Sequence, residues 1–582
     1  MLCVVILLLL DWTTSVAQPT SLANNNYTAL PIRLELSLAG GFAEIRSNHF
    51  HSGLDIRTGG KEGEPVYAPA DGYVSRINIS AWGGGKVLYI THPDGYRTVY
   101  MHLSAFCGKI GEFVKNYQYS NHTFAFDIDL PADSIRVCKG QMIALTGNTG
   151  GSAGPHLHYE IRLAHNDQPI NPLYFGLKYN DNIAPTIAGI KLYPANSTAT
   201  INNRNAVYNA YPTTVATTKK GSKNKHKTNP KTDSITVSGP FYAGIYTYDQ
   251  MEPLSHNKNG VEKIELLVDG ELFFRYQVPT FLFEETRIVN ALIDYPHYLR
   301  TREYFILTRH LHGDRNNFST AYRNNGYIQF DDNAIHTLLY RVSDYKGNVT
   351  TRQIQIKSTP FDTSNVAHNT FLAEGEPITY YKRFKLIRPE FSMYAEPYTV
   401  YENDQLVYIR KKNQGFLTDI HHITLKKNPL PPHQSITVEI DIPAIIPYVL
   451  RDKLTVVCTN GKKVSACATT RQGDKLKAVS RTFGGFAIQV DTIPPQLTPL
   501  NFKNNQQITS NKIKVKISDN LTGVISYHCE VNGQWQLAEH DGKTASLTVE
   551  ASHLRRGNNT VKFSLSDAVG NTTIKEFTLH RK

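Results

Sequence analysis

Apolar and polar positions alternate along much of this 582-residue chain, and long apolar stretches at helical spacing are few. The clearest alternation runs from Lys86 to His92 and from Tyr96 to Leu103, and the turn signal Pro93-Asp94-Gly95 separates the two segments. On the second segment, alternation places Tyr100 and His102 on the same face. The 33 Tyr, 39 Gly and 29 Pro residues also favour strands and turns. We therefore predict a mainly β protein.

A glycine-rich run, Gly147 to Pro155, leads into a predicted strand that begins at His156. Successive strand side chains point to opposite faces, so His156 and His158 project from the same face. The apolar residues of the strand face the other way, where they can pack into a core: Leu157, Tyr159 and Ile161. Two imidazoles behind a loop with almost no side chains indicate a metal site beside an open groove.

A second pair of candidate ligands lies earlier in the chain. His51 and Asp55 are four residues apart on a predicted loop that enters a strand, and Gly53 lets the backbone bend tightly between them. One imidazole and one carboxylate at this spacing could supply two ligands to a metal. A salt bridge within the loop would explain the same pair when it stands alone.

Each of these signals has a simpler explanation by itself. A single histidine such as His102 is more often an ordinary core or surface residue than a catalytic group, and a glycine loop is often a plain hairpin connection. Their coincidence in one stretch favours the metal site. His310-Leu311-His312 repeats the spacing of the histidine pair, but no glycine loop or companion motif lies near it. We interpret it as a surface loop.

Five motifs, taken in order, resemble the lysostaphin/LytM-type zinc endopeptidases of bacterial cell walls, peptidase family M23. They are His51-x3-Asp55, Tyr100-x-His102-Leu103, Lys139-Gly140-Gln141, Thr146-Gly147-Asn148-Thr149-Gly150 and Gly154-Pro155-His156-Leu157-His158. The resemblance covers residues of about 42 to 178 and implies an antiparallel β peptidase domain of the duplicated hybrid motif type. The chain departs from the family in a longer segment between His102 and Lys139, which could reshape the groove.

The resemblance implies that His51, Asp55 and His158 bind Zn²⁺. It also implies that His156 and His102 are the unligated catalytic pair, without deciding which is the base and which stabilises the oxyanion. The chemistry agrees, because three protein ligands leave a fourth position for water, and a site of net charge +1 lowers the pKa of that water from ~15.7 towards ~7. Glu160 shares a strand face with His158 and could orient it.

Repeated motifs mark the rest of the chain. The linker-like segment 181–187 recurs as 491–497, and the turn signal in 342–348 recurs in 565–571. We therefore predict two copies of one β-sandwich, with an immunoglobulin-like pattern of short strands. The predicted segments are a signal peptide (1–17), a zinc metallopeptidase domain (18–178), an immunoglobulin-like sandwich with insertions (181–360), a β-rich domain of unknown role (361–490) and a second immunoglobulin-like sandwich (491–582).

Two insertions enlarge the first copy of the sandwich. Residues 196–233 are polar and rich in lysine, which favours a solvated loop over a contact with anionic polymers. Residues of about 276 to 330 contain a stretch from Phe283 to Leu292 that could be helical. A third inserted segment, 107–138, lies within the peptidase domain and could gate its groove.

Charge and cysteine content indicate the compartment and the partners of the protein. The formal charge of +12 and pI of about 9.1 suit an anionic bacterial envelope. No recognition helix or RNA-binding signature supports nucleic acid as a partner. After removal of the signal peptide, the five remaining cysteines form no disulfide framework, and no segment is long and apolar enough to span a membrane. We expect export to the periplasm, the cell envelope or the extracellular space.

These observations favour an exported zinc endopeptidase that cuts peptide bonds in the cross-links or stem peptides of peptidoglycan. Anionic envelope polymers are a second candidate partner. The alternative is a catalytically silent scaffold that binds the wall and activates another hydrolase. Such scaffolds lose metal ligands, whereas this chain keeps all of the residues that the resemblance requires. An adhesion or carbohydrate-binding protein dominated by its sandwiches is a third possibility.

Overall fold

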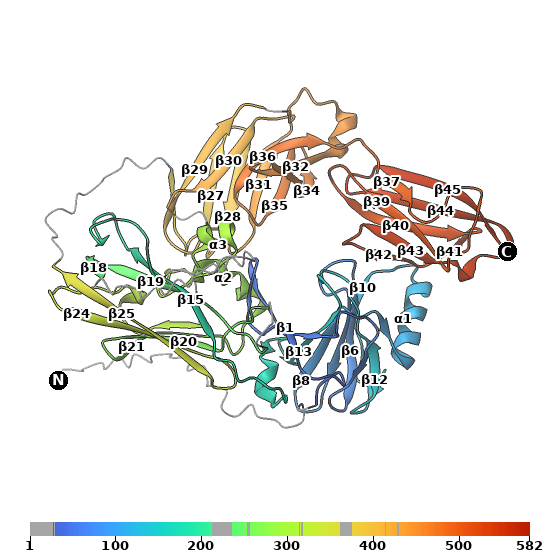
Figure 1. Ribbon diagram of the computed structural model, residues 1–582. Coiled ribbons are helices and arrows are strands. Elements are labelled where there is room, and N and C mark those ends of the chain that lie inside the picture. The colour runs from blue at the N-terminus through green and yellow to red at the C-terminus, as the bar shows by residue number, and fades with distance from the viewer. Residues whose placement is uncertain are drawn as a thin grey trace, which may run out of the picture.

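The computed structural model describes residues 27, 29–211, 235–252, 257–313, 315, 318–360, 375–413, 415–427 and 430–582. These residues are mainly β-strand, as the alternation predicted (Figure 1). The predicted signal peptide and the lysines from Lys219 to Lys231 lie outside the described residues. Among the helices of the described residues, none has both the length and the apolar character that crossing a membrane requires.

The first domain is built on a nine-stranded antiparallel sheet with the order β1-β4-β13-β8-β7-β6-β10, in which β11 also pairs with β6 and β14 with β13. A smaller sheet has the order β5-β12-β9, and β2 pairs with β3. The elements are β1 (Leu38–Gly40), β2 (Ile45–Arg46), β3 (His49–Phe50), β4 (Leu54–Arg57), β5 (Pro65–Tyr67), β6 (Gly72–Ile79), β7 (Lys86–Thr91), β8 (Tyr96–Met101), β9 (Ala105–Phe106), α1 (Gly108–Ser120), β10 (Phe126–Asp129), β11 (Arg136–Val137), β12 (Met142–Leu145), β13 (His156–Leu163), β14 (Pro169–Ile170) and η2 (Pro172–Phe175).

The predicted hairpin is confirmed, because β7 and β8 pair antiparallel across the turn. The predicted second strand is two residues too long, since β8 ends at Met101. His102 has a left-handed φ of 62°, and its N–H donates to the carbonyl oxygen of Gly84 at 2.8 Å. Alternation along the strand therefore does not determine where the His102 ring points.

The inserted segment 107–138 contains regular structure, namely α1, β10 and β11. Helix α1 buries Ile110 and Val114, and β10 extends the large sheet by pairing with β6. In the strand order, β10 lies at the edge remote from β4 and β13.

The second domain encloses its core between a four-stranded sheet, β17-β15-β19-β22, and a seven-stranded sheet, β16-β18-β25-β24-β20-β21-β23. Helical turns over 283–301 include the stretch that the sequence suggested. The first described part of the polar segment 196–233 forms short strands rather than a loop. The elements are β15 (Thr186–Pro194), β16 (Thr200–Ile201), β17 (Tyr208–Tyr211), β18 (Ile235–Ser238), β19 (Phe241–Tyr248), β20 (Lys263–Val268), β21 (Glu271–Gln277), η3 (Phe283–Ile288), α2 (Val289–Leu292), α3 (Tyr295–Thr301), β22 (Ile306–Leu307), β23 (Ser319–Ala321), η4 (Asn324–Gly326), β24 (Ile335–Ser343) and β25 (Val349–Thr359).

The first two domains share one continuous hydrophobic core. The rings of Phe42 and Phe50 lie 5.6 and 5.5 Å from the ring of Phe281, and all three side chains are 1% exposed. The backbone N–H of Phe50 also donates to Thr286 Oγ1 at 2.7 Å. Apolar burial of this kind fixes the second domain against the segment that leads into β4.

The third domain has its own core between the sheets β26-β29-β30-β36-β32-β33 and β27-β28-β31-β35-β34. The elements are β26 (Glu376–Ile378), β27 (Phe384–Arg388), β28 (Phe391–Ala395), β29 (Asp404–Lys411), β30 (Ile420–Leu425), β31 (Ile436–Asp441), η6 (Tyr448–Lys453), β32 (Leu454–Asn460), β33 (Lys463–Ala466), β34 (Ala468–Gln472), β35 (Lys475–Ser480) and β36 (Gly484–Val490).

The last domain packs the sheets β37-β39-β43-β42 and β38-β45-β44-β40-β41 around a separate core. In the second of these sheets, β44 pairs antiparallel with β45. The short strand β38 pairs with β45 in parallel, as β18 pairs with β25 in the second domain. The elements are β37 (Gln496–Pro499), β38 (Gln506–Gln507), β39 (Lys512–Ser518), β40 (Val524–Val531), β41 (Gln534–Trp535), β42 (Ala538–Asp541), β43 (Ser546–Glu550), η7 (Ala551–His553), β44 (Gly557–Asp567) and β45 (Thr572–Arg581).

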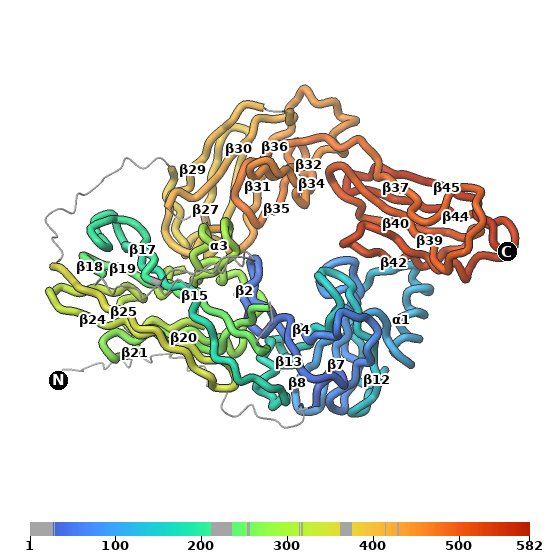
Figure 2. Tube along the Cα trace, viewed as in Figure 1, coloured from blue at the N-terminus to red at the C-terminus, as the bar shows by residue number. Residues whose placement is uncertain are grey.

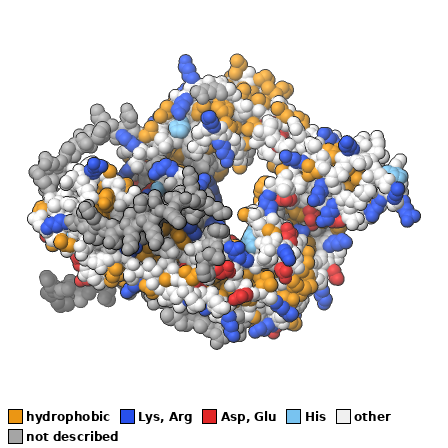
Figure 3. Space-filling view, in the orientation of Figure 1, with side chains coloured by type: hydrophobic (Ala, Val, Ile, Leu, Met, Phe, Trp, Pro, Cys, Tyr) orange, Lys and Arg blue, Asp and Glu red, His pale blue; other side chains and the backbone are white. Residues whose placement is uncertain are grey.

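The domains form a ring in which the last domain contacts the first (Figures 1 and 2). Trp535 stacks on His122 with ring centroids 5.1 Å apart and meets Tyr119 edge-on at 5.3 Å. Lys86 Nζ and Glu539 Oε1 form an ion pair at 2.9 Å. In the space-filling view an opening remains between the domains, and acidic and basic side chains are interspersed near it (Figure 3).

Candidate metal centre

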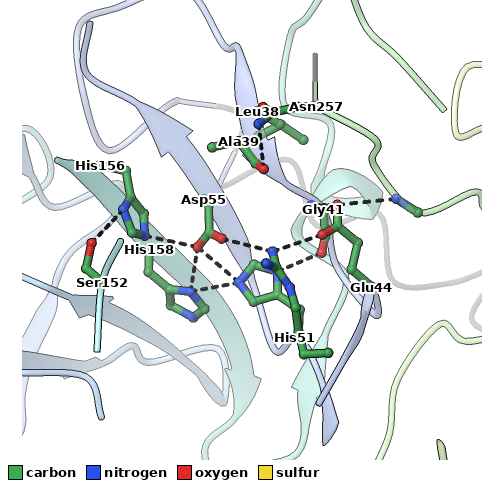
Figure 4. Close-up of polar contacts among 12 residues, drawn as sticks. Leu38, Ala39, Gly41, Glu44, His51, Asp55, Ser152, His156, His158 and Asn257 are labelled. Atoms are coloured by element: carbon green, nitrogen blue, oxygen red, sulfur yellow. Dashed lines mark hydrogen bonds and ion pairs between the residues drawn. The ribbon is translucent and has the colours of Figure 1, made fainter. Parts of the chain in front are cut away.

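Two neighbouring strands of the large sheet bring the predicted ligands together. Strands β4 and β13 pair antiparallel, with Asp55 opposite His158 and Arg57 opposite His156. His51 lies in the short connection between β3 and β4, and its ring turns towards the same point (Figure 4). Residues more than 100 positions apart in the sequence therefore converge on one spot.

Three donor atoms form a compact triangle at this point. His51 Nε2 lies 3.0 Å from Asp55 Oδ1 and 3.0 Å from His158 Nδ1, and His158 Nδ1 lies 2.9 Å from Asp55 Oδ1. Ligand atoms about 2.0 Å from one zinc ion in a tetrahedron lie ~3.3 Å apart, close to these values. The three side chains are one of three groups, among the described residues, that could hold a metal ion.

Hydrogen bonds at the outer ring nitrogens of His51 and His158 determine which nitrogen of each ring faces the triangle. His51 Nδ1 lies 2.7 Å from the carbonyl oxygen of Gly41, and His158 Nε2 lies 2.8 Å from Glu160 Oε1. Each of these oxygens accepts a hydrogen bond from the imidazole N–H, so the neutral ring presents an unprotonated nitrogen to the triangle. The donor set, two imidazole lone pairs and one carboxylate oxygen, fits Zn²⁺.

The electrostatics of the centre favour a positive charge. Burial opposes ionisation of Asp55, but His51 and hydrogen bonds from His156 and His158 outweigh burial and hold the pKa of the carboxyl well below its usual range. Burial likewise lowers the pKa of His158, but its hydrogen bonds to Asp55 and Glu160 prevail and raise that pKa to about 9. The carboxylates of Asp55 and Glu160 therefore both stabilise positive charge at the buried ring of His158.

Glu160 is fully buried and is held by three partners. Burial would raise its pKa, but Arg162 and His158 outweigh burial and lower the pKa to about 2, so Glu160 is an anion. Its Oε1 also accepts a hydrogen bond from Ser52 Oγ at 2.6 Å, and its Oε2 accepts one from Arg162 Nε. The contact with His158 that strand alternation suggested is present.

The remaining two histidines flank the triangle. His156 Nε2 lies 3.3 Å from Asp55 Oδ1, and His156 Nδ1 lies 2.8 Å from the carbonyl oxygen of Gly154. The rings of His102 and His156 are 4.8 Å apart, and His102 Nδ1 lies 2.8 Å from the carbonyl oxygen of Thr149. Burial, followed by the charges of His158 and His156, lowers the pKa of His102 to about 3, so this ring is neutral.

A groove of about 880 Å³ opens over these residues. Its walls come from the segments that carry the five candidate residues and from two glycine-containing loops, 83–84 and 151–154. No residue of the inserted segment 107–138, all of which the structure describes, lines this groove.

Close approach of neighbouring backbone explains two glycines near the groove, Gly150 and Gly53. Gly150 has a φ of +70°, and a Cβ atom there would lie 2.3 Å from the backbone nitrogen of Gly85. At Gly53, a Cβ atom would lie 2.4 Å from the carbonyl oxygen of Tyr159 and 2.9 Å from His158 Nε2. Side chains at these positions would push the loops and the ligands apart.

Two polar residues at the centre had no signal in the sequence. Arg46 Nη2 lies 3.3 Å from Asp55 Oδ2 and 2.9 Å from Glu44 Oε2, so a guanidinium borders the carboxylate ligand. Ser152 Oγ lies 3.2 Å from His156 Nδ1. Neither residue belongs to a spaced motif, and only folding brings them to the site.

The other histidine pair does not join a metal centre among the described residues. His310 Nε2 lies 2.9 Å from Ser319 Oγ, and His312 stacks on Tyr380 with ring centroids 6.4 Å apart. The intervening Leu311 is 4% exposed, so this stretch is partly packed rather than an open surface loop.

Family models match two parts of the chain. Residues 49–119 and 131–172 match Peptidase family M23, and residues 376–491 match the Zu5-like domain. The first match leaves out 120–130, within the segment that the sequence indicated to be longer than usual. The second match covers most of the domain to which the sequence assigned no role.

Curated relatives resemble the chain over the first domain. An uncharacterized metalloprotease of Haemophilus influenzae is 40% identical over 123 residues, 21% of this chain and 20% of that protein. The peptidoglycan DD-endopeptidase ShyA of Vibrio cholerae is 32% identical over 123 residues, 21% of this chain and 22% of that protein. The chain thus spans about a fifth of the length of these relatives.

The solved catalytic domain of lysostaphin from Staphylococcus simulans is 26% identical, with a TM-score of 0.18, over 23% of this chain and 87% of that domain. The match to the family model contains the His51, Asp55 and His158 triangle together with His102 and His156. The first domain of this chain thus contains a match to peptidase family M23.

Proposed function

We propose that the protein is a zinc metalloendopeptidase that hydrolyses peptide bonds in peptidoglycan. The observation that carries this proposal is the triangle of His51 Nε2, Asp55 Oδ1 and His158 Nδ1, whose two imidazoles are oriented by hydrogen bonds through their opposite nitrogens. These three residues would hold Zn²⁺. A bound zinc ion polarises a carbonyl group and lowers the pKa of a coordinated water.

His102 and His156 supply the proton transfers in this proposal. His102 is neutral at physiological pH and can accept a proton, which an imidazolium could not do. His156 lies against Asp55 and is oriented by Gly154 and Ser152, so its ring is held beside the reacting bond. One ring accepts the proton of the attacking water, and the other stabilises the oxyanion or protonates the leaving amine.

The substrate class rests on the relatives and on the groove. ShyA is named as a peptidoglycan DD-endopeptidase. The glycine-containing walls of the groove leave room for an extended peptide with small side chains, such as a cross-link or a stem peptide. Export to the periplasm or cell envelope follows from this substrate and remains a prediction, as does contact with anionic envelope polymers.

The test uses purified full-length protein and intact peptidoglycan. We expect about one zinc ion per chain and release of new amine termini from the wall. His158→Ala should lose both zinc and cleavage, whereas His156→Ala should keep zinc and lose cleavage by about 10²–10⁴-fold. His312→Ala, an exposed histidine outside the groove, is the matched control and should behave as the wild type.

Two results would contradict the proposal. Undiminished cleavage by His156→Ala and His158→Ala would remove the assigned site. Stoichiometric zinc and tight wall binding without any cleavage by the wild type would instead support a silent scaffold that activates another hydrolase.

A further inference from the structure

Three buried carboxylates meet where the chain passes from the peptidase domain into the first sandwich. Asp181 precedes β15, Asp249 follows β19 and Asp344 follows β24. One oxygen atom of each lies within 4.8 Å of the other two, and the residues are 7, 4 and 0% exposed. Carboxylates this close and this dry repel one another unless a cation or a proton compensates their charge.

Hydrogen bonds hold the Asp344 carboxylate rigidly and connect it to the backbone of Asp181. Asp344 Oδ1 accepts from the backbone N–H groups of Lys346 and Asn348 at 2.8 and 2.9 Å. The Asn348 side chain donates to Asp344 Oδ2 at 2.8 Å and to the carbonyl oxygen of Asp181 at 3.3 Å. Asn348 thereby ties the linker to the sandwich, and the oxygens keep their positions relative to one another.

Two further observations point to a missing ligand. Asp249 Oδ1 and Asn259 Oδ1 receive no hydrogen bond among the described residues, although the two side chains are only 4 and 5% exposed. Asp249 and Asn259 form an antiparallel bridge with N–H to O distances of 2.9 Å in both directions, so their side chains project from the same side. The two buried oxygens without donors therefore lie on the same side of this bridge, and Asp249 lies beside the other two carboxylates.

The charges at the junction agree with this geometry. Burial, together with Asp181 and Asp344, raises the pKa of Asp249 to about 7. Burial also raises the pKa of Asp181, and the Lys346 ammonium, which lies 4.1 Å over the ring of Tyr179, only partly opposes this rise. The charge of Lys346 therefore offsets only part of the negative charge at this junction.

We propose that Asp181, Asp249 and Asp344, together with the amide oxygen of Asn259, bind one calcium ion. A set made only of oxygen ligands suits a hard cation. Two ligands of one Ca²⁺ ion can lie up to about 5 Å apart, because each bond is ~2.3–2.6 Å long, whereas the shorter bonds to Mg²⁺ limit the separation to ~4 Å. The three oxygens lie within 4.8 Å of one another and so fall inside the range that calcium allows.

The ion would join the linker to two strand ends of the sandwich and so set the orientation of the sandwich after the peptidase domain. The same arrangement recurs before the last sandwich in Asp491, Asp519 and Asp567. There, Asn571 donates to Asp567 Oδ2 at 2.7 Å and to the carbonyl oxygen of Asp491 at 2.9 Å. That copy is more open, and two backbone N–H groups already occupy Asp519 Oδ2.

The experiment titrates CaCl₂ into the full-length, zinc-loaded protein without chelator, by calorimetry and by thermal unfolding. We expect calcium to bind with a Kd of about 10⁻⁴–10⁻³ M or tighter and to raise the Tm by ~2–4 °C. Asp249→Asn should bind one fewer equivalent of calcium than the wild type and lose most of the rise in Tm. Its Tm without calcium should be unchanged or higher, because the substitution removes a buried charge, and this result would exclude misfolding.

Asp331→Asn is the matched control. Asp331 is exposed and lies before β24, whereas Asp344 follows this nine-residue strand, so the two are about 30 Å apart. The variant should bind as much calcium as the wild type. The proposal is wrong if millimolar CaCl₂ neither binds nor raises the Tm, or if Asp249→Asn binds the same number of equivalents. An equal or larger effect of MgCl₂ would overturn the assignment to calcium.

Discussion

The ligand triangle depends on one buried residue that would not touch the metal. Glu160 is 0% exposed and connects the ring of His158 to the guanidinium of Arg162. A carboxylate that accepts the outer N–H of a ligand histidine fixes its tautomer and raises its basicity. The affinity of the centre should therefore respond to Glu160 even though three other residues supply the donor atoms.

Replacement of this carboxylate tests the inference. We expect Glu160→Gln to lower zinc affinity by about 10–100-fold, because Gln can orient His158 but carries no charge. The free energy of unfolding should also fall by ~3 kcal/mol, since Arg162 loses its buried partner. Competition with a zinc chelator, at a temperature where circular dichroism shows folded protein, measures the affinity.

Glu265→Gln separates the two effects. Glu265 is 2% exposed and pairs with Arg275 and Arg341 in the second domain, but it contacts no ligand histidine. This variant should lose comparable stability and keep the zinc affinity of the wild type. Equal zinc affinity in both variants would show that Glu160 has only a structural role.

The sequence indicated the candidate centre because the residues proposed as its ligands come in short motifs. Strand alternation put His156 and His158 on one face, and the carboxylate of Asp55 is now seen directly across the strand pair from His158. His102 was identified only through its motif, since its left-handed φ breaks the alternation. Arg46 could not be identified at all, because its contact with Asp55 depends on how the preceding segment folds back.

At the scale of elements, the centre is shaped by two loops that touch backbone to backbone. The N–H of Gly151 donates to the carbonyl oxygen of Gly83 at 2.7 Å, and the backbones of Gly85 and Gly150 are too close for a side chain between them. The contact holds the wall of the groove next to His102 and His156.

Gly150→Ala should disturb this contact. The left-handed φ of +70° costs an alanine about 1–2 kcal/mol, and its Cβ would lie 2.4 Å from the carbonyl oxygen of Gly83. We expect a loss of more than 2 kcal/mol in unfolding free energy and lower cleavage activity. Gly154→Ala is the control, because its φ is ordinary and no atom lies within 4 Å of the added Cβ. Equal Tm values for the two variants would contradict this account of the loops.

The third domain should be sensitive to acid through one buried histidine on β30. His421 is 0% exposed, stacks on Phe391 at 4.7 Å and shares a hydrogen bond of 2.9 Å between its Nδ1 and the hydroxyl of Tyr408. Burial, followed by the charge of Arg410, lowers the pKa of His421 to about 4. Between pH 6.5 and 4 the unfolded chain binds this proton and the folded chain does not, so stability falls as the pH falls.

His421→Phe should reduce this acid sensitivity. The stability that the wild-type domain loses between pH 7 and 4 should shrink by about 2 kcal/mol in the variant, because one group no longer has to stay neutral when folded. Calorimetric unfolding at several pH values measures the difference. A pH profile identical to that of the wild type would show that His421 does not carry this effect.

Strands with strong alternation of apolar and polar residues were easier to predict than helices whose stability depends on packing. The β7–β8 hairpin has both alternation and a turn signal. Helix α1 was missed although Ile110 and Val114 have helical spacing, because two glycines and many polar residues dilute the pattern. Its stability comes from packing on the domain, which local sequence does not encode.

At the scale of the whole molecule, the last sandwich supports the outer side of the groove. The Lys543 side chain donates to the carbonyl oxygen of Asn148, and Trp82 meets His540 edge-on at 6.3 Å. Trp82 precedes the glycine loop of residues 83–85, so a domain some 450 residues further along the chain contacts the wall of the candidate metal centre. No sequence motif predicted this contact, because neither partner surface has a periodic pattern.

Trp535→Ala should open the ring. Loss of the stacked contacts with His122 and Tyr119 leaves the edge contact between Trp82 and His540 and a few polar pairs, which contribute less to stability than the two lost ring contacts. We expect the radius of gyration, measured by small-angle scattering, to increase while zinc content stays the same. Ile574→Ala, which alters an exposed side chain on β45, should leave the scattering curve unchanged. A compact Trp535→Ala protein would show that the ring is held by other contacts.

The continuous core of the first two domains has a practical consequence. The family match ends at residue 172, which suggests a convenient place to truncate the protein. A fragment cut there would expose Phe42 and Phe50 to water, since Phe281 and its neighbours would be gone. Such a fragment should aggregate or misfold on expression, and a usable minimal fragment would have to extend to about residue 360.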